Sequence, residues 1–338
     1  MVMHFQALPA AVRWAALAIG GLTVFLIWDQ HHWWKIRDEY AFGFIVPLFV
    51  AYILYDRWPR LARGFIGGAD APEAGGSGSP WTRFLEGFLQ VLAVLMVVGG
   101  LLSFLLGVLY RAMEGQNLIT SNFLAFGYAN ILLGAAFIHA RDRADGQRNA
   151  LPTRWQLAML FLFPALIWML SVPMFGAVEK TISTFLMNRV AVVVYHFFDL
   201  LGYAVVREGS ILKLPLGDVG VEDACSGIRS LMACLFAGSF LGAVYFTQLW
   251  KKVFLVGTAM VFAFINNILR SLFLTAWAYA KGPTGLDSHV IVWGIDLGNV
   301  HDFTGWMVLG LTVVCLLALV KLFSIQFEFD PPPEGVSS

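Results

Sequence analysis

Four residues in the second half of the chain carry side chains that could take part in catalysis. Cys225 supplies a thiol, Arg229 and Arg270 supply guanidinium groups, and His301 supplies an imidazole. A thiolate attacks a carbonyl carbon to form a thioester, an imidazole transfers protons, and a guanidinium stabilises an oxyanion. These residue types can carry out chemistry together, provided that the fold brings them to one place.

Each of these residues also has a simpler interpretation. A cysteine in an apolar protein is often a small packing residue, and we assign that role to Cys234 and Cys315. Cys234 follows Cys225 by roughly 13 Å along the same predicted helix, too far for a disulfide. An arginine near a helix end often extends to lipid headgroups, and a single loop histidine is more often structural than catalytic. The enzyme hypothesis thus rests on the combination.

The composition shows that a membrane must position these residues. Hydrophobic residues make up 59% of the chain and charged residues only 13%, which is far more apolar than a soluble domain. The 22 basic and 22 acidic residues balance, so we expect no nucleic-acid partner. Three cysteines form no disulfide framework, and no C-x-x-C spacing suggests a metal, so we expect no metal and no other cofactor.

Apolar runs predict an all-α membrane protein of about eight transmembrane helices, because a spanning helix needs roughly 20 mostly apolar residues. We expect a single polytopic membrane domain over residues 1–338. The second run is short and contains Pro47. The predicted spans are 11–28, 41–55, 84–109, 118–139, 155–172, 227–248, 253–278 and 303–323.

The segments between the spans suggest four further features. A Gly/Ser/Pro-rich stretch, 64–80, predicts a flexible cytoplasmic loop. His31-His32-Trp33-Trp34 predicts an aromatic belt at the membrane interface rather than a metal site. In a long extracytoplasmic segment, 173–224, helical spacing over 181–200 predicts an amphipathic helix in the membrane surface. Residues 203–216 then predict a short β-hairpin before the sixth span.

Basic residues predict the orientation of the chain. Arginines flank the 64–80 loop and crowd the connection between the fourth and fifth spans, and Lys251-Lys252 occupy the tight turn between the sixth and seventh. The positive-inside rule places these three connections in the cytoplasm, and with them both termini.

This orientation brings the four candidate residues to the outer face of the membrane. The sixth span begins outside, which places Cys225 and Arg229 there. Arg270 lies 17 residues after Val253, roughly 26 Å along a helix that crosses outward. His301 enters from the same side, just before the last span.

Three ordered motifs contain these residues. Ala-Cys-Ser-Gly-Ile-Arg-Ser covers 224–230, Asn-Ile-Leu-Arg covers 267–270, and His-Asp-Phe-Thr-Gly covers 301–305. In order and spacing the chain resembles the exosortase/archaeosortase family of multi-span membrane cysteine enzymes. Gly-Phe-Ile-Val-Pro at 43–47 is similar to a further family element, although Phe42 replaces the histidine that commonly precedes it.

The resemblance implies a membrane-embedded cysteine protease or transpeptidase at the outer face of a bacterial inner membrane. Its implied partners are exported proteins with a C-terminal sorting signal: a short motif such as Pro-Glu-Pro, a hydrophobic helix and a basic tail. Analogy with sortases favours transfer of the cleaved protein to a lipid or glycan acceptor over release by water. Within a catalytic core at 221–305, the implied roles are nucleophile for Cys225, invariant arginine for Arg270, histidine for His301, and support for Arg229, Ser226 and Asn267.

Other classes of function stay open at the level of sequence. A membrane acyltransferase could use His301 as a base with the thiol as a bystander. An anion transporter could use Arg229 and Arg270 in a water-filled cavity. A scaffold for a polysaccharide machine needs none of these residues. Only the cysteine mechanism requires Cys225.

Overall fold

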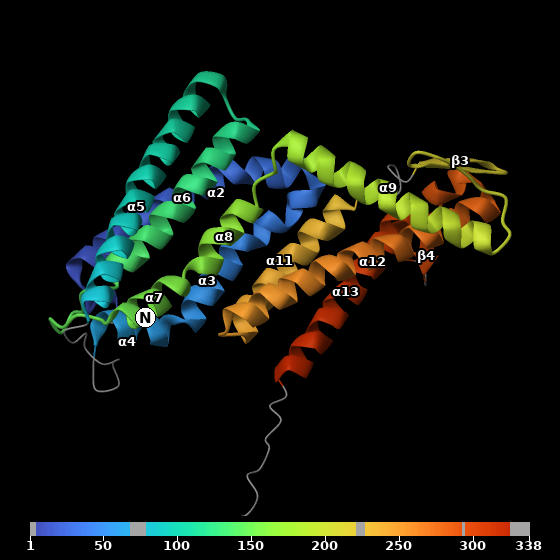
Figure 1. Cartoon of the computed structure of the whole chain (residues 1–338). Helices are drawn as coiled ribbons and strands as arrows, with labels where there is room; N and C mark the ends of the chain where they lie inside the picture. The colour runs from blue at the N-terminus through green and yellow to red at the C-terminus, as the bar shows by residue number, and fades with distance from the viewer. Residues whose placement is uncertain (1–4, 68–78, 221–226, 293–294, 325–338) are drawn as a thin grey trace, which may run out of the picture. The chain divides into compact units, whose positions relative to one another are not determined.

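The computed structural model describes residues 5–67, 79–220, 227–292 and 295–324 (Figure 1). These residues are mostly helical, with two small antiparallel sheets, which confirms the all-α membrane class. Within the described part of the chain, nine helical segments are long and apolar enough to cross a membrane, one more than predicted. The helices are α2 (Ala10–Ile36), η1 (Asp38–Ile45), α3 (Val46–Asp56), α4 (Trp58–Ile66), α5 (Pro80–Glu114), α6 (Leu118–His139), α7 (Leu151–Met159), α8 (Leu162–Leu170), α9 (Gly176–Leu200), α11 (Ile228–Tyr245), α12 (Leu249–Lys281), η2 (Pro283–Asp287) and α13 (Val300–Ser324).

Each of the eight predicted spans overlaps a helix, but two of them are interrupted. The second consists of the 3₁₀ helix η1 followed by α3, with Pro47 in the first turn of α3, where a missing N–H costs no hydrogen bond. The fifth divides into α7 and α8. Pro164 cannot donate to the carbonyl of Leu160, and that carbonyl instead accepts a hydrogen bond from Arg57 Nη1. Proline therefore sets both interruptions.

The ninth candidate is α9, which begins five residues before the amphipathic helix predicted at 181–200. Its 25 residues are long enough to cross a membrane, although it is the least apolar of the nine segments. The sequence therefore predicted the helix but underestimated its length. Its placement in the membrane surface stays a prediction.

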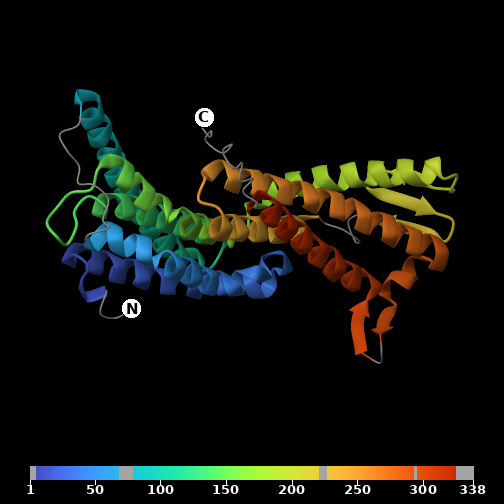
Figure 2. The same cartoon turned by 90° about the horizontal axis from the view of Figure 1, so that it is seen from below.

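The predicted hairpin at 203–216 is part of a three-stranded antiparallel sheet. Strands β1 (Val206–Glu208), β2 (Ile211–Leu214) and β3 (Gly217–Gly220) pair in that order. The hairpin prediction was thus too small by one strand, because two glycines give β3 a low strand propensity. A second sheet, β4 (His289–Val292) with β5 (Ile295–Asn299), was not predicted and leads directly into α13 (Figure 2).

Two other predictions need correction. Trp33 and Trp34 do not form an exposed belt: α2 continues through them, and both are buried. Trp33 Nε1 donates to Ser121 Oγ over 2.8 Å, and Trp34 Nε1 donates to the carbonyl of Ser171 over 3.0 Å. An indole with a buried donor needs such a partner, so these rings serve packing inside the bundle.

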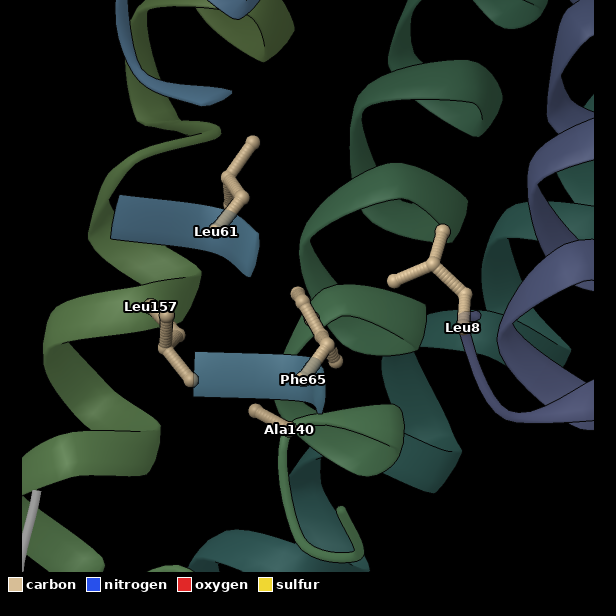
Figure 3. Close-up of a cluster of buried hydrophobic side chains, with 5 residues drawn as sticks. All are labelled: Leu8, Leu61, Phe65, Ala140 and Leu157. Atoms are coloured by element: carbon tan, nitrogen blue, oxygen red, sulfur yellow. The ribbon is translucent and has the colours of Figure 1, made fainter. Parts of the chain in front are cut away.

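The loop predicted at 64–80 is too wide at both ends. Residues 64–66 belong to α4 and Pro80 begins α5, while 68–78 lie outside the described residues. Because α4 is amphipathic, Leu61 and Phe65 are buried one turn apart while its arginines at 60 and 63 are exposed. Figure 3 shows the cluster that these two side chains form with Leu8, Ala140 and Leu157.

The described chain divides into two compact units. Unit 1 contains residues 5–189 together with 227–236, and unit 2 contains 190–220 together with 237–324. Glycines allow α5 and α6 of unit 1 to lie side by side (Figure 1). A Cβ at Gly127 would lie 2.7 Å from the carbonyl oxygen of Gly100, and one at Gly134 would lie 2.7 Å from that of Ala93. Such close backbone approach is typical of helix packing in membranes.

Candidate active site

Arg270 and Asn267 lie on α12, the 33-residue helix of unit 2. Asn266 Nδ2 donates to Thr312 Oγ1 on α13, and both side chains are buried. A polar pair between two membrane helices fixes their register, because each group would otherwise lack a partner in an apolar surrounding. This contact sets the position of Arg270 along α13.

His301 occupies the first turn of α13, and the residues around it explain why the helix begins there. Asn299 Oδ1 accepts from the amide of Asp302 over 2.7 Å, as a helix N-cap does. The amide of Val300 donates to the carbonyl of Ser288 over 3.0 Å, which ties the start of α13 to the residue before β4. These two hydrogen bonds fix the first turn of α13 and, with it, the backbone of His301.

Arg270 and His301 are in direct contact. Arg270 Nη2 lies 3.2 Å from His301 Nε2 and donates to the His301 carbonyl oxygen over 3.1 Å. A guanidinium only donates hydrogen bonds, so the ring nitrogen that faces it accepts one. The motifs that contribute the two residues are thereby joined at one point of unit 2.

Asp302 also contacts the imidazole, whose Nδ1 is 3.4 Å from Arg270 Nη2 as well. Its Oδ1 is 3.4 Å from His301 Nδ1. A carboxylate that accepts from Nδ1 leaves Nε2 as the acceptor, which matches the shorter contact to Arg270. This assignment of the ring protons follows from the hydrogen-bond network. The His-Asp-Phe-Thr-Gly motif contains Asp302, but the sequence does not predict its orienting role. That role follows from the position of its carboxylate beside Nδ1 in the structure.

A short polar row continues from Arg270 along α12. Asn267 and Ser271, one turn apart, are each 2% exposed. Within the described chain, Asn267 Oδ1, Arg270 Nε and Ser271 Oγ have no hydrogen-bond partner. Sequence reasoning named Asn267 but missed Ser271, although its spacing of four residues from Asn267 already predicts the same helix face. The row adds hydrogen-bonding capacity next to the arginine.

The cysteine motif is described only in part. Cys225 and Ser226 lie outside the described residues. The sixth span was predicted to begin at residue 227, and α11 begins at Ile228, after Gly227 at a φ of 64°. Arg229 lies in the first turn of α11 in unit 1, and its Nη2 is 2.7 Å from Asp38 Oδ2. The structure therefore brings Arg270 and His301 into contact. It also shows an ion pair between Arg229 and Asp38 that the sequence did not predict.

The hairpin before His301 carries a second histidine–carboxylate pair. His289 Nδ1 is 2.8 Å from Asp296 Oδ2, and the amide of Gly298 donates to Asp296 Oδ1 over 2.9 Å. The hydrogen bond from Gly298, followed by that from His289, lowers the pKa of the Asp296 carboxyl below its ordinary value. These contacts close the β4–β5 hairpin on itself rather than on the Arg270–His301 pair.

Comparison with known proteins accounts for most of the chain. The family model described as transmembrane exosortase matches residues 33–318, a range that includes all three motifs. No curated protein and no solved structure matches the chain. The match agrees with the resemblance of the motifs and with the multi-pass helical fold. The chain therefore belongs to the transmembrane exosortase family, whose general role is that of a membrane transpeptidase or protease.

Proposed function

We propose that the chain cleaves the C-terminal sorting signal of exported proteins at the outer face of a bacterial inner membrane, through a thioester on Cys225. The observation that carries this proposal is the contact between Arg270 and His301, which come from separate motifs 31 residues apart. A guanidinium and an imidazole that meet beside buried polar groups suit acyl transfer. The family match supports the general class of reaction.

The first step forms the acyl-enzyme. Arg270 Nη2 gives up its hydrogen bond to His301 Nε2 and keeps the one to the His301 carbonyl oxygen. The freed Nε2 takes the thiol proton, and the Cys225 sulfur attacks the carbonyl carbon of the scissile peptide. The C=O electron pair moves to oxygen, where Arg270 stabilises the negative charge. When the tetrahedral intermediate collapses, the C–N bond breaks and His301 returns the proton to the leaving amine. The products are a thioester on Cys225 and the free sorting-signal peptide.

The second step resolves the thioester. A nucleophile loses a proton to His301 and attacks the thioester carbonyl, and the C–S bond then breaks to regenerate the thiol. Water would give a free carboxylate, whereas an amine or hydroxyl on a lipid or glycan would give an amide or an ester. We infer transfer to such an acceptor, by analogy with sortases. The substrates that we propose carry a short motif, a hydrophobic helix and a basic tail.

A processing assay tests the proposal. We expect Cys225→Ala, Arg270→Ala and His301→Ala each to stop maturation of a co-expressed protein that carries such a tail, while the variants still insert into the membrane. Loss of one oxyanion donor alone lowers kcat by about 10²–10³-fold in other enzymes. Cys234→Ala and Cys315→Ala serve as matched thiol controls and should process normally.

A trapping experiment distinguishes the thiol mechanism from its alternatives. Hydroxylamine should release the arrested substrate from a Cys225-dependent acyl-enzyme, because it attacks thioesters. An unchanged mature band in Cys225→Ala would contradict the proposal and favour an acyltransferase based on His301 or an anion transporter. A genome that encodes several proteins with one shared tail motif would supply the reporter substrates.

A further inference from the structure

The ion pair between Arg229 and Asp38 joins residues 191 positions apart in the chain. Asp38 is the first residue of η1, and Arg229 lies in the first turn of α11. An arginine at this end of a membrane helix would otherwise extend toward lipid headgroups. The Asp38 carboxylate, 2.7 Å from Nη2, instead directs the guanidinium toward η1.

A second contact fixes the same face of α11. Phe236 follows Arg229 by seven residues, which is two helical turns, so both side chains lie on one side of the helix. The ring centroid of Phe42 on η1 is 4.9 Å from that of Phe236, and the ring of Phe49 on α3 stacks on Phe236 at 5.3 Å. Phe236 is buried. The contacts of Arg229 and Phe236, two turns apart, fix how this part of α11 is rotated about its axis and where it lies along η1 and α3.

Phe42 is also the position at which the chain departs from the family element. A histidine commonly stands there in the sequences that the chain resembles, and here an aromatic ring packs on Phe236 instead. The ring that stands in place of the histidine therefore packs against α11.

The segment that makes these contacts is itself well anchored. Arg37 Nη1 is 3.2 Å from Glu179 Oε1 on α9, and the amide of Met174 donates to the Tyr40 hydroxyl over 3.0 Å. Tyr40 is fully buried, and Gly43 lies so close to the Trp34 indole that a Cβ would be 2.1 Å from Nε1. Since any side chain at Gly43 would clash with a buried ring, η1 has little freedom to shift.

We propose that Asp38 is a positioning residue for the reaction: through Arg229 it orients the end of α11 that follows Cys225 in the chain. The inference rests on the proposed function, in which Cys225 is the nucleophile. Asp38 has no role in bond making. The side chains of Asp38 and Arg229 are 75% and 55% exposed, and such pairs add little to stability. The effect of breaking the pair should therefore appear in the reaction and not in folding.

A double-mutant cycle on the full-length protein tests the inference. With a tailed reporter as substrate, Asp38→Ala and Arg229→Ala should each lower kcat about tenfold and leave KM within about twofold, the pattern of a displaced reacting group. The double variant should be no slower than either single variant, because both substitutions remove one interaction. Single effects within about twofold, or additive effects in the double variant, would overturn the inference.

A charge exchange gives a rescue that a merely structural role would not give. Asp38→Arg combined with Arg229→Asp should restore kcat to within about threefold of wild type, because the pair re-forms with its signs exchanged. A combined variant as slow as Arg229→Ala would contradict the inference. Glu208→Gln is the matched control, since it breaks another exposed ion pair, with Lys213 at 2.6 Å on β2, and should leave kcat unchanged.

Thiol reactivity separates positioning from activation. In a Cys234→Ala/Cys315→Ala background, Asp38→Ala should leave the alkylation rate of Cys225 by iodoacetamide within about twofold of its parent while kcat falls. A parallel fall in alkylation would overturn positioning. If Cys225→Ala itself processes substrate, the proposed function fails. If Cys225→Ala is inactive but Asp38→Ala is normal, only this inference fails.

Discussion

At the scale of single residues, the contact between Arg270 and His301 is the firmest point of the site. One guanidinium nitrogen serves both the imidazole and the carbonyl of the same histidine. This arrangement uses the planar fork of arginine, which presents several donors in fixed directions. Arg270 Nε is buried and has no hydrogen-bond partner in the described part of the chain, so we propose it as a donor to the substrate oxygen.

The planar guanidinium of Arg270 predicts that Arg270→Lys loses processing activity although it keeps the positive charge. A lysine ammonium is a point charge on a flexible stem and cannot hold His301 while it also faces an oxyanion. We expect kcat to fall by about tenfold or more, in the direction of the 10²–10³-fold loss of a missing oxyanion donor. The measurement is steady-state processing of a tailed reporter by purified variants.

Arg229→Lys is the matched control for that experiment, because a lysine there can still pair with Asp38. It should retain most of the activity. Equal losses in Arg270→Lys and Arg229→Lys would show that the two arginines have equivalent roles, contrary to the geometry.

The sequence predicted candidate site residues where a motif contains them. It did not predict residues whose contact partner lies far away in the chain. Arg270 and His301 were named from their motifs, and the structure places them in contact. Asp38 carries no motif signal, and a separation of 191 residues hides its pairing with Arg229. The role of Asp302 likewise depends on which ring nitrogen it approaches, a fact of geometry alone.

At the scale of elements, apolar length predicted the helices well, because crossing a membrane requires a helical backbone and a minimum number of apolar residues. Short strands were harder, since β3 and β4–β5 have few residues and no long alternating pattern. The β4–β5 hairpin matters to the site because α13, which carries His301 in its first turn, follows it directly, and because the amide of Val300 donates to the carbonyl of Ser288, just before β4.

The lowered pKa of Asp296 predicts acid sensitivity in that hairpin. Because the folded-state pKa lies below the unfolded value of about 3.9, the carboxylate contributes stability above that pH and loses it as pH falls through the folded pKa. We expect the described backbone amides of 289–299, corrected for intrinsic exchange rates, to keep their protection from hydrogen exchange from about pH 6 down to about pH 4. They should lose it as the pH falls further, toward about pH 3.

Asp296→Asn tests the assignment of that acid sensitivity. The variant should show the lower protection at both ends of the pH range, because its side chain cannot carry the charge that accepts from Gly298. Asp218→Asn, on strand β3 of the other sheet, is the control and should leave the 289–299 segment unchanged. Wild-type protection in Asp296→Asn at about pH 6 would contradict the assignment.

At the scale of the whole molecule, α9 decides which side of the membrane holds the site. With the N-terminus inside and α9 in the membrane surface, α11 begins outside and α12 crosses outward. If α9 crosses instead, every later connection changes sides, and the turn with Lys251-Lys252 faces outward against the positive-inside rule. The low apolarity of α9, which carries Glu179, Lys180 and Arg189, favours the first arrangement.

Thiol labelling distinguishes the two arrangements. In a Cys225→Ala/Cys234→Ala/Cys315→Ala background, Thr284→Cys follows α12 and Arg148→Cys precedes α7, and both positions are exposed in the structure. If α9 does not cross, a membrane-impermeant maleimide should label Thr284→Cys on intact spheroplasts and Arg148→Cys only after permeabilisation. Protection of both sites in intact spheroplasts would show that α9 crosses. It would place His301 in the cytoplasm and contradict cleavage at the outer face, whatever the chemistry of Cys225.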